Sequence, residues 1–443
     1  MNDLFETQRE MRQRREAAMK RGVMAVLDVG SYKVSCIVMQ FAGDDAEPPS
    51  PDVTMPRMGS FRVVGVGTVR SRGVRFGEIT DMNETESAIR SAVQKAQKMA
   101  GLRVDHVLVA FAGGRPRSYG LTGEVEVEQG EVTERDIGRV LASCDVPPYG
   151  PDREAIHALP VNFSLDHRTG LSDPRGQVGV NLSVDMHMLT LSDAPVYDLL
   201  ECVQRCDLEV AGLSFSGFAS GVSTLMENEQ QLGAAIVDIG GGSTAISVFM
   251  RKHMIYGDAV RLGGDHITND ICQGLHLSYE DAERIKTLHG GLVATGSDGG
   301  VEIEVPNPMA QWENDRRMVT RSELIGVMRP RVEEILEEVR ARLDASGFEH
   351  LPTQRIVLTG GSSAIPGLQD LAERVLGGQV RIGRPLRVQG LPQASAGAAF
   401  SSAVGLALHA SHPMDECWDF EMPIDRIGTR RIKAAMRWFK QNW

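Results

Sequence analysis

The chain is poor in cysteine and carries none of the short motifs that identify the commonest catalytic folds. Its six cysteines form no C-x-x-C pair and follow no signal peptide, so we expect reduced thiols in a cytosolic protein. There is no Walker A, H-E-x-x-H or G-x-S-x-G sequence, which excludes P-loop NTPases, zincin metalloproteases and α/β-hydrolases. The longest run of small apolar residues, 394–410, is interrupted by serines and too short to cross a bilayer, so it predicts a buried helix.

Two places in the chain share an aspartate at the end of an apolar run, followed at once by a glycine-bearing turn. They are Asp28-Val29-Gly30-Ser31 and the segment DIGGGST at 238–244. Each turn joins a strand rich in β-branched residues to a second alternating strand, which predicts a hairpin. Either copy alone could be an ordinary hairpin turn. Glycine lets the backbone approach an anion, however, and the duplication predicts two phosphate-binding turns with a Mg²⁺-binding carboxylate at each mouth.

A third glycine turn, Leu358–Ser363, ends another apolar run, and its glycines would let an adenosine lie flat on the backbone. Between the second and third turns, Ser278 begins a predicted helix that carries Glu283 and Lys286 on one face. Such a pair is usually only a solvated helix surface. The order of the three turns resembles the phosphate 1, phosphate 2 and adenosine segments of the superfamily of actin, sugar kinases and heat-shock 70 ATPases.

The whole chain has a net charge of −12, but the C-terminus is basic. Residues 426–443 contain six basic side chains and no acidic one, and on a helix the apolar and basic residues fall on opposite faces. This pattern predicts a helix lying in an anionic membrane surface. A calmodulin-type target helix and a nucleic-acid-binding arm are alternatives; the aromatic face argues against the second, so we expect no nucleic acid partner. The residues expected at the membrane are Arg430, Ile432, Lys433, Met436, Arg437, Trp438, Phe439, Lys440 and Trp443.

Together these features resemble the FtsA family of bacterial cell-division proteins, the actin-like membrane tethers of the tubulin-like FtsZ. The resemblance runs from about residue 22 to 410 and resumes in the tail. Its most specific segments are DVGSYKV (28–34), SRGVRFGEI (71–79), VDIGGGST (237–244) and VLTGGS (357–362). Sugar kinases, heat-shock ATPases and the related pilus-assembly proteins would be expected to lack the terminal amphipathic helix.

The resemblance implies an α/β fold with two duplicated ribonuclease-H-like halves around a nucleotide cleft, each half with an inserted subdomain. The expected divisions are a disordered or frayed extension (1–21), a first actin-like core (22–83, 184–207 and 395–410), an inserted FtsA-type subdomain (84–183), a second core (208–262 and 318–394), a second inserted subdomain (263–317), an acidic linker (411–425) and the membrane-targeting helix (426–443).

The resemblance also implies the ligands and their residues. ATP would be bound with Mg²⁺, which Asp28 and Asp238 would hold through water, and Lys33 would reach the phosphates. The other residues expected at the nucleotide are Gly30, Ser31, Gly240, Gly241, Gly242, Ser243, Thr244, Glu283, Lys286, Gly360, Gly361 and Ser362. Hydrolysing relatives place a water-orienting glutamate or glutamine in the stretch that corresponds to 214–221, where this chain has none. We therefore expect no catalytic residue, and ATP as mainly a structural ligand.

The expected function is to tether FtsZ filaments to the cytoplasmic face of the inner membrane at the division septum and to help recruit later division proteins. The second inserted subdomain would receive the C-terminal peptide of FtsZ. Arg316 and Arg317 suit an acidic peptide, because they come just before a helix that the capping box Thr320–Glu323 opens. Self-association into filaments is also implied. The alternatives are a small-molecule phosphotransferase of the sugar kinase branch and a pilus-assembly actin-like protein.

Overall fold

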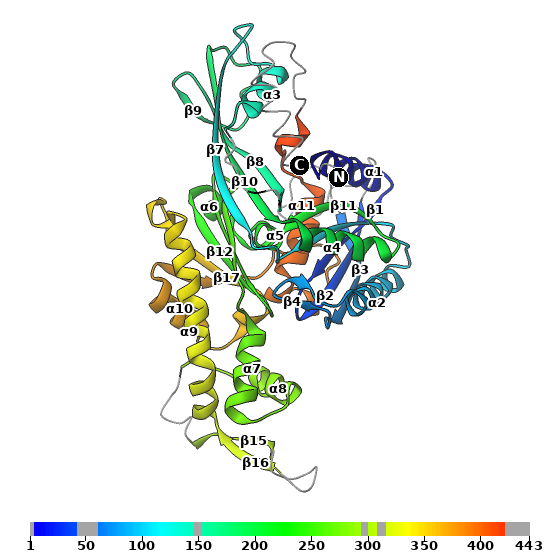
Figure 1. Ribbon diagram of the computed structural model, residues 1–443, viewed down its shortest axis with the longest axis vertical. Coiled ribbons are helices and arrows are strands. Elements are labelled where there is room, and N and C mark those ends of the chain that lie inside the picture. The colour runs from blue at the N-terminus through cyan, green and yellow to red at the C-terminus, as the bar shows by residue number, and fades with distance from the viewer. Residues whose placement is uncertain are drawn as a thin grey trace.

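The computed structural model describes residues 4–41, 61–145, 150, 152–293, 300–307 and 316–420. Figure 1 shows an elongated molecule with two sheets side by side at its centre, a third sheet projecting at one end and a helical subdomain with a small hairpin at the other. None of the helices in these ranges has the length and hydropathy needed to cross a membrane.

The first central sheet has five strands in the order β11-β6-β1-β2-β3. These strands are β1 (Val23–Val29), β2 (Lys33–Phe41), β3 (Phe61–Arg70), β6 (His106–Phe111) and β11 (Glu209–Phe215). The central strand β1 pairs antiparallel with β2 and parallel with β6. Helices α2 (Met82–Ala100) and α4 (Asp193–Arg205) bury their apolar faces with one side of this sheet, and α11 (Ser401–Ser411) packs on the other side. A short hairpin of β4 (Val74–Arg75) and β5 (Glu78–Ile79) follows β3.

The second central sheet repeats this pattern, with the order β14-β13-β12-β17-β18. Its strands are β12 (Ala234–Ile239), β13 (Thr244–Met250), β14 (His253–Val260), β17 (Arg355–Thr359) and β18 (Gln379–Ile382). Again the central strand pairs antiparallel with the next strand and parallel with a later one. Helices α9 (Arg321–Ala345) and α10 (Leu368–Leu376) cover one side, while α5 (Ser216–Thr224) and the short α6 (Glu227–Leu232) lie on the other. Two halves with one topology confirm the predicted duplication.

The projecting sheet of the first inserted domain has the order β7-β10-β8-β9 and carries α3 on one face. Its elements are β7 (Arg117–Glu126), α3 (Glu134–Ala142), β8 (Arg153–Leu165), β9 (Arg168–Leu171) and β10 (Asn181–Ser192). Thr133 caps α3 through a reciprocal capping box with Asp136. The predicted boundaries 84–183 are wrong at both ends, because α2 and β6 belong to the first central sheet and β10 continues to Ser192.

The second inserted subdomain consists of α7 (Gly264–Leu275), α8 (Tyr279–His289) and a hairpin of β15 (Glu302–Pro306) with β16 (Arg316–Thr320). Thr320 and Glu323 form the predicted capping box at the start of α9. The predicted second core also needs one correction at its start. It was expected to begin at residue 208, but β11 pairs with β6 in the first sheet. The remaining 3₁₀ turns are η2 (Phe348–His350), η3 (Gly361–Ala364), η4 (Gln393–Ser395), η5 (Ala398–Phe400) and η6 (Cys417–Asp419).

Both ends of the described chain differ from the prediction. The extension expected to be frayed or disordered forms α1 (Leu4–Lys20), whose Met11 and Ala18 are buried against the first half. The first part of the expected linker is also folded, because Cys417, Trp418 and Phe420 lie in the hydrophobic core of the inserted domain. Residues 421–425 of that linker and the predicted membrane helix, 426–443, lie outside the described residues.

Helices α5 and α11 cross where Gly405 lies against the backbone of Ala219, and a Cβ at Gly405 would overlap the Ala219 carbonyl oxygen. We predict that Gly405→Ala lowers the free energy of unfolding by about 1–3 kcal/mol, because the helices must separate. Gly326→Ala is the matched control, since Gly326 is an exposed position in α9 with open space around it. That change should raise stability by up to about 1 kcal/mol through helix propensity. Thermal unfolding of both variants checks the pair; equal midpoints would contradict the close crossing.

Candidate functional site

A cavity of about 370 Å³ lies where the two halves meet. It is lined by the two predicted hairpin turns, the third glycine turn and one face of α8. The predicted residues that line it are Asp28, Gly30, Ser31, Lys33, Asp238, Gly240, Gly241, Gly242, Ser243, Glu283, Lys286, Gly360, Gly361 and Ser362. Thr244, which was also predicted, does not line the cavity. Its side chain is buried, and its hydroxyl donates to the carbonyl of Leu262 at 2.8 Å.

The two hairpin turns have the same local geometry. Gly30 N–H donates to the carbonyl of Lys33 at 3.0 Å, and Gly240 N–H donates to the carbonyl of Ser243 at 3.0 Å. The turns also face each other, because a Cβ on Gly242 would collide with the side chain of Ser31. Only glycine therefore allows the two mouths to approach this closely.

The third glycine turn is joined to the second. Ser362 Oγ donates to the carbonyl of Gly240 at 3.3 Å. Gly360 has φ +88 and stands where a Cβ would strike the carboxylate of Asp238, so both its conformation and its surroundings require glycine. The three turns consequently form one continuous backbone surface around the cavity.

Asp28, Asp238 and Lys33 all line the cavity, and the charge of Lys33 acts on both carboxylates. Burial raises the pKa of Asp238 to about 6, and the nearby charge of Asp28 adds to this effect. Burial likewise raises the pKa of Asp28, opposed by the charge of Lys33. Two effects on the pKa of Lys33 oppose each other. Burial lowers this pKa to about 8, whereas the two carboxylates favour the charged form. Two carboxylates thus share one ammonium group in a poorly hydrated place.

The ammonium group of Lys33 has unused hydrogen-bonding capacity. Its Nζ lies 3.2 Å from the ring centroid of Phe400, and it has no hydrogen-bond partner among the described residues. A buried donor without a partner is costly unless a ligand supplies the acceptor. An anion such as a phosphate fits this position, since it would also meet the N–H groups of the glycine turns. The paired carboxylates could hold a hydrated divalent cation beside that anion.

Each aspartate is also held by a serine on one of the two crossing helices. Ser220 of α5 donates to Asp238, and Ser402 of α11 donates to Asp28 at 3.4 Å. The sequence analysis missed both serines. Ser402 interrupts the apolar stretch 394–410, and Ser220 lies in the stretch 214–221 that was searched only for a glutamate or glutamine.

Glu283 and Lys286 form a structured pair rather than a solvated helix surface. Their side chains are joined at 2.6 Å, with relative exposures of only 16% and 11%. Lys286 Nζ also donates to Thr268 Oγ1 at 2.7 Å, and that hydroxyl lies 2.6 Å from Glu283 Oε2. Because α7 and α8 fix the pair at the cavity wall, the Glu283 carboxylate can accept hydrogen bonds from a ligand's hydroxyl groups.

Other residues at the cavity were missed by sequence reasoning. They are chiefly Tyr32, Ser216, Gly264, Asp265 and Ala399. Tyr32 lies within the first turn, and Asp265 begins α7, where its N–H donates to the carbonyl of Gly241 at 2.8 Å. Asp265 also accepts a hydrogen bond from the Tyr279 hydroxyl at 2.9 Å. Only their contact with a segment distant in sequence marks them as part of the site.

The predicted partner-binding arginines lie far from this cavity, in strand β16 at the opposite end of the second inserted subdomain. Arg316 is exposed, whereas Arg317 is partly buried and donates to the carbonyl of Leu275. The nine predicted membrane residues, from Arg430 to Trp443, lie outside the described residues.

Comparison with known proteins assigns the family. The profile "Cell division protein FtsA" matches residues 235–405, and the profile "SHS2 domain inserted in FTSA" matches residues 113–190. The chain is 41% identical to the cell division protein FtsA of Rhizobium meliloti over 87% of each chain. It is 34% identical to that of Pseudomonas aeruginosa, over 96% of this chain and 100% of the relative. The chain belongs to the FtsA family.

FtsA of Escherichia coli K12 is 30% identical over 88% of this chain and 90% of its own. The inserted-domain profile also agrees with the observed sheet of β7 to β10 rather than with the predicted boundaries 84–183. The role of the family, cell division, is therefore the role of this chain in its broad sense.

Solved structures confirm the predicted actin-like fold. The structure of a PilM-PilN type IV pilus biogenesis complex matches with a TM-score of 0.60, over 88% of this chain and 99% of the other, at 16% identity. MreB 5 of Spiroplasma citri bound to AMPPNP matches with a TM-score of 0.51, over 87% and 95%, at 13% identity. At these identities the likeness concerns the fold alone.

We predict that Asp238→Asn makes the ligand-free protein more stable near neutral pH. The folded-state pKa of Asp238 is raised from 3.8 to about 6, so the stability that its proton contributes is fully present below the unfolded value and is lost as pH rises from there through about 6. Asparagine is neutral throughout. The variant should exceed the wild type by about 2 kcal/mol at about pH 7.5, and the gap should shrink below about pH 6.

Urea unfolding of the ligand-free protein, at neutral and at acidic pH, measures this difference in the free energy of unfolding between variant and wild type. Asp198→Asn, at an exposed position of α4, is the control and should follow the wild type at both. A gap for Asp238→Asn that widens on acidification would contradict the placement of Asp238 beside Asp28.

Proposed function

We propose that this chain is an ATP-binding, actin-like protein that tethers FtsZ filaments to the cytoplasmic membrane and helps recruit later division proteins. The observation that carries the proposal is the convergence of two duplicated aspartate turns on one cavity, with the unsatisfied Lys33 amine between them. A polyphosphate is the ligand class that uses all three features at once.

In this proposal, ATP joins the two halves of the molecule. The glycine turns donate backbone N–H groups to the phosphates, Lys33 neutralises part of their charge, and Glu283 with Lys286 meets the ribose and base. Mg²⁺, held by Asp28 and Asp238 through water, supplies the charge that balances the phosphates. The stretch 214–221 contains serines but no carboxylate or amide to orient a water, which favours slow hydrolysis at most and a structural role for ATP.

The proposed FtsZ-binding surface is the outer face of β16. Arg316 and Met318 alternate along this strand and therefore lie on the same face, and Met318 is 53% exposed. An exposed cation beside an exposed apolar side chain suits a peptide that combines a carboxylate with apolar residues. Arg317 points to the other face and is better suited to holding the hairpin on α7.

The proposed membrane contact is the amphipathic tail, 426–443, whose support comes from sequence alone. Its aromatic residues would each contribute about 1.5–3 kcal/mol on burial, and each basic residue near an anionic leaflet about 1 kcal/mol, before the cost of ordering the helix. One such helix binds reversibly, so many copies in a filament would hold far better than one. This is the physical reason to couple the tail to a protein that self-associates.

We predict that Lys33→Met weakens ATP binding about ten- to a hundredfold, because a charge-assisted hydrogen bond to phosphate is lost. Isothermal titration with MgATP measures the affinity. Lys98→Met, at an exposed position of α2, is the matched control and should bind as the wild type does. Unchanged ATP affinity in Lys33→Met would remove the main support for the cavity as a nucleotide site.

The tether is tested by floating anionic vesicles with FtsZ polymers and this chain. The full chain should bring FtsZ to the vesicles, and truncation after Asp425 should leave both proteins unbound. Arg316→Ala should remain on the vesicles but carry several-fold less FtsZ. Arg284→Ala, an exposed change in the same subdomain, is the control. Vesicle binding that survives the truncation contradicts the membrane role, and equal FtsZ recruitment by Arg316→Ala contradicts the β16 surface.

A further inference from the structure

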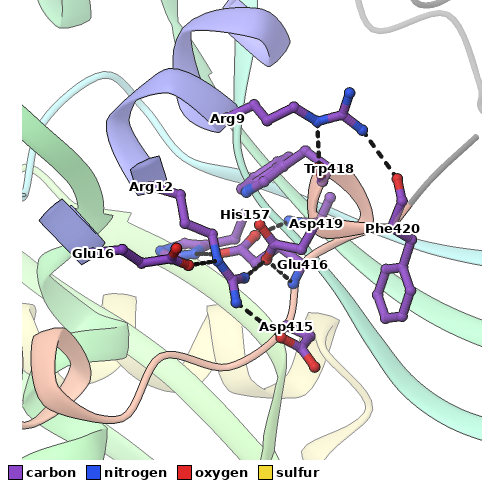
Figure 2. Close-up of polar contacts among 10 residues, drawn as sticks. Arg9, Arg12, Glu16, His157, Asp415, Glu416, Trp418, Asp419 and Phe420 are labelled. Atoms are coloured by element: carbon purple, nitrogen blue, oxygen red, sulfur yellow. Dashed lines mark hydrogen bonds and ion pairs between the residues drawn. The ribbon is translucent and has the colours of Figure 1, made fainter. Parts of the chain in front are cut away.

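The N-terminal helix α1 binds the segment Asp415–Phe420, which lies near the C-terminal end of the chain (Figure 2). Arg9 Nε donates to the carbonyl of Trp418 at 2.8 Å, and Arg9 Nη2 donates to the carbonyl of Phe420 at 3.0 Å. One turn later, Arg12 forms an ion pair with Asp419 and another with Asp415, the latter at 3.2 Å. Arg9 and Arg12 are three residues apart and lie on one face of the helix. A basic helix face thus meets an acidic segment.

The same segment is held from its other side by the inserted domain. Glu416 is 6% exposed; its Oε2 accepts the N–H of Ala158 at 2.7 Å and its Oε1 lies 3.0 Å from His157 Nδ1. His157 Nε2 accepts the N–H of Phe215 at 3.0 Å, so Nδ1 carries the proton and donates it to Glu416. The buried carboxylate is therefore fully hydrogen-bonded, and β8 is linked through His157 to β11 of the first half.

Apolar contacts reinforce this docking. Cys417, Trp418 and Phe420 are each less than 9% exposed and belong to the hydrophobic core of the inserted domain. The segment thus completes that core while its backbone and its acidic side chains are bonded to α1, which packs on the first half through Met11 and Ala18. No described strand pairs with the segment, so it can leave without breaking either sheet.

We infer that α1 and the inserted domain together form a docking site for the acidic, aromatic segment Asp415–Phe420, and that this docking fixes the position of Phe420, from which the sequence continues into the tail. When the site opens, His412–Phe420 joins the tether and extends its reach by about 30 Å at most. The opening also removes two aromatic side chains from the core of the inserted domain. The tail's reach and the freedom of the inserted domain are thereby controlled by one contact.

The effect of a longer tether on membrane attachment rests on the proposed function. The docking itself can be measured without lipid, nucleotide or FtsZ. The probe is Cys417, which is 2% exposed and whose thiol pKa is raised by burial, so it reacts slowly while docked. Full-length native protein is treated with a maleimide, and the modified cysteines are quantified peptide by peptide. Cys36, fully buried in β2, reports in the same sample on whether the body remains folded.

Arg9→Ala/Arg12→Ala should label Cys417 at least tenfold faster than the wild type, because charge-assisted bonds of this kind are each worth about a tenfold change in an equilibrium. Cys36 should stay protected. Arg14→Ala, on the same helix but paired only locally with Glu10 at 3.3 Å, is the control and should leave Cys417 slow. Slow labelling in the double variant, or fast labelling in the wild type, overturns the inference.

A charge reversal provides a second and independent route. Arg12→Glu should expose Cys417, and adding Asp419→Arg should restore most of its protection, since the pair is then reversed rather than broken. If the double alanine variant also labels at Cys36, it has lost its fold. The comparison of Arg12→Glu with and without Asp419→Arg then tests the docking in its place. Failure of the second change to restore protection counts against docking through α1. Vesicle binding can fail while the labelling succeeds, so the two proposals are separable.

Discussion

The site depends on two like charges held close together at the floor of a cavity. Asp28 and Asp238 are each the next-to-last residue of the central strand of one half, so their meeting follows directly from the facing of the two duplicated hairpins. Lys33 compensates for one of the two charges, and burial keeps the pKa of both carboxylates raised. This arrangement lowers the stability of the ligand-free protein, so stability alone does not explain it. It becomes favourable when a cation and an anion enter together, which is the electrostatic reason for favouring a metal-bound polyphosphate.

Helices α5 and α11, behind the cavity, connect the two aspartates to each other across the two halves. Ser220 on α5 and Ser402 on α11 each donate to one aspartate, and the helices cross at the contact of Gly405 with Ala219. The two aspartates are thus each hydrogen-bonded to one of two helices that cross at close range. A ligand that changes the separation of the aspartates must act on both halves through that crossing.

What the sequence predicted well was local. The turns at Asp28 and Asp238, the cap at Thr320 and the glycine turn at Gly360 each depend on a few neighbouring residues, and all are present. The errors concern pairings between distant segments. The parallel pairing of β6 with β1 and of β11 with β6 joins strands that a repeat search treats as insert and second half. No short pattern encodes such a pairing, because it depends on which edge the rest of the fold leaves free.

The end segments show the same limit in another form. The Arg-rich composition of α1 and the acidic composition of 411–420 each look like disorder when considered alone. Together they neutralise each other, and the sparse apolar residues Met11, Cys417 and Trp418 become sufficient once they reach existing cores. Two segments of opposite charge at opposite ends of a chain are therefore better judged as a possible pair than one at a time.

The inserted domain contacts both halves of the molecule. It is fixed to the first half through His157 and Phe215 and through the docked segment on α1. It also touches the second half, because Ser118 Oγ donates to the carbonyl of Gly257 at 2.9 Å and accepts its N–H at 2.7 Å. A domain bound to both halves must rotate or strain when the cavity between them changes width. The docked segment Asp415–Phe420 is one of these attachments, so its release would loosen a domain that contacts both halves.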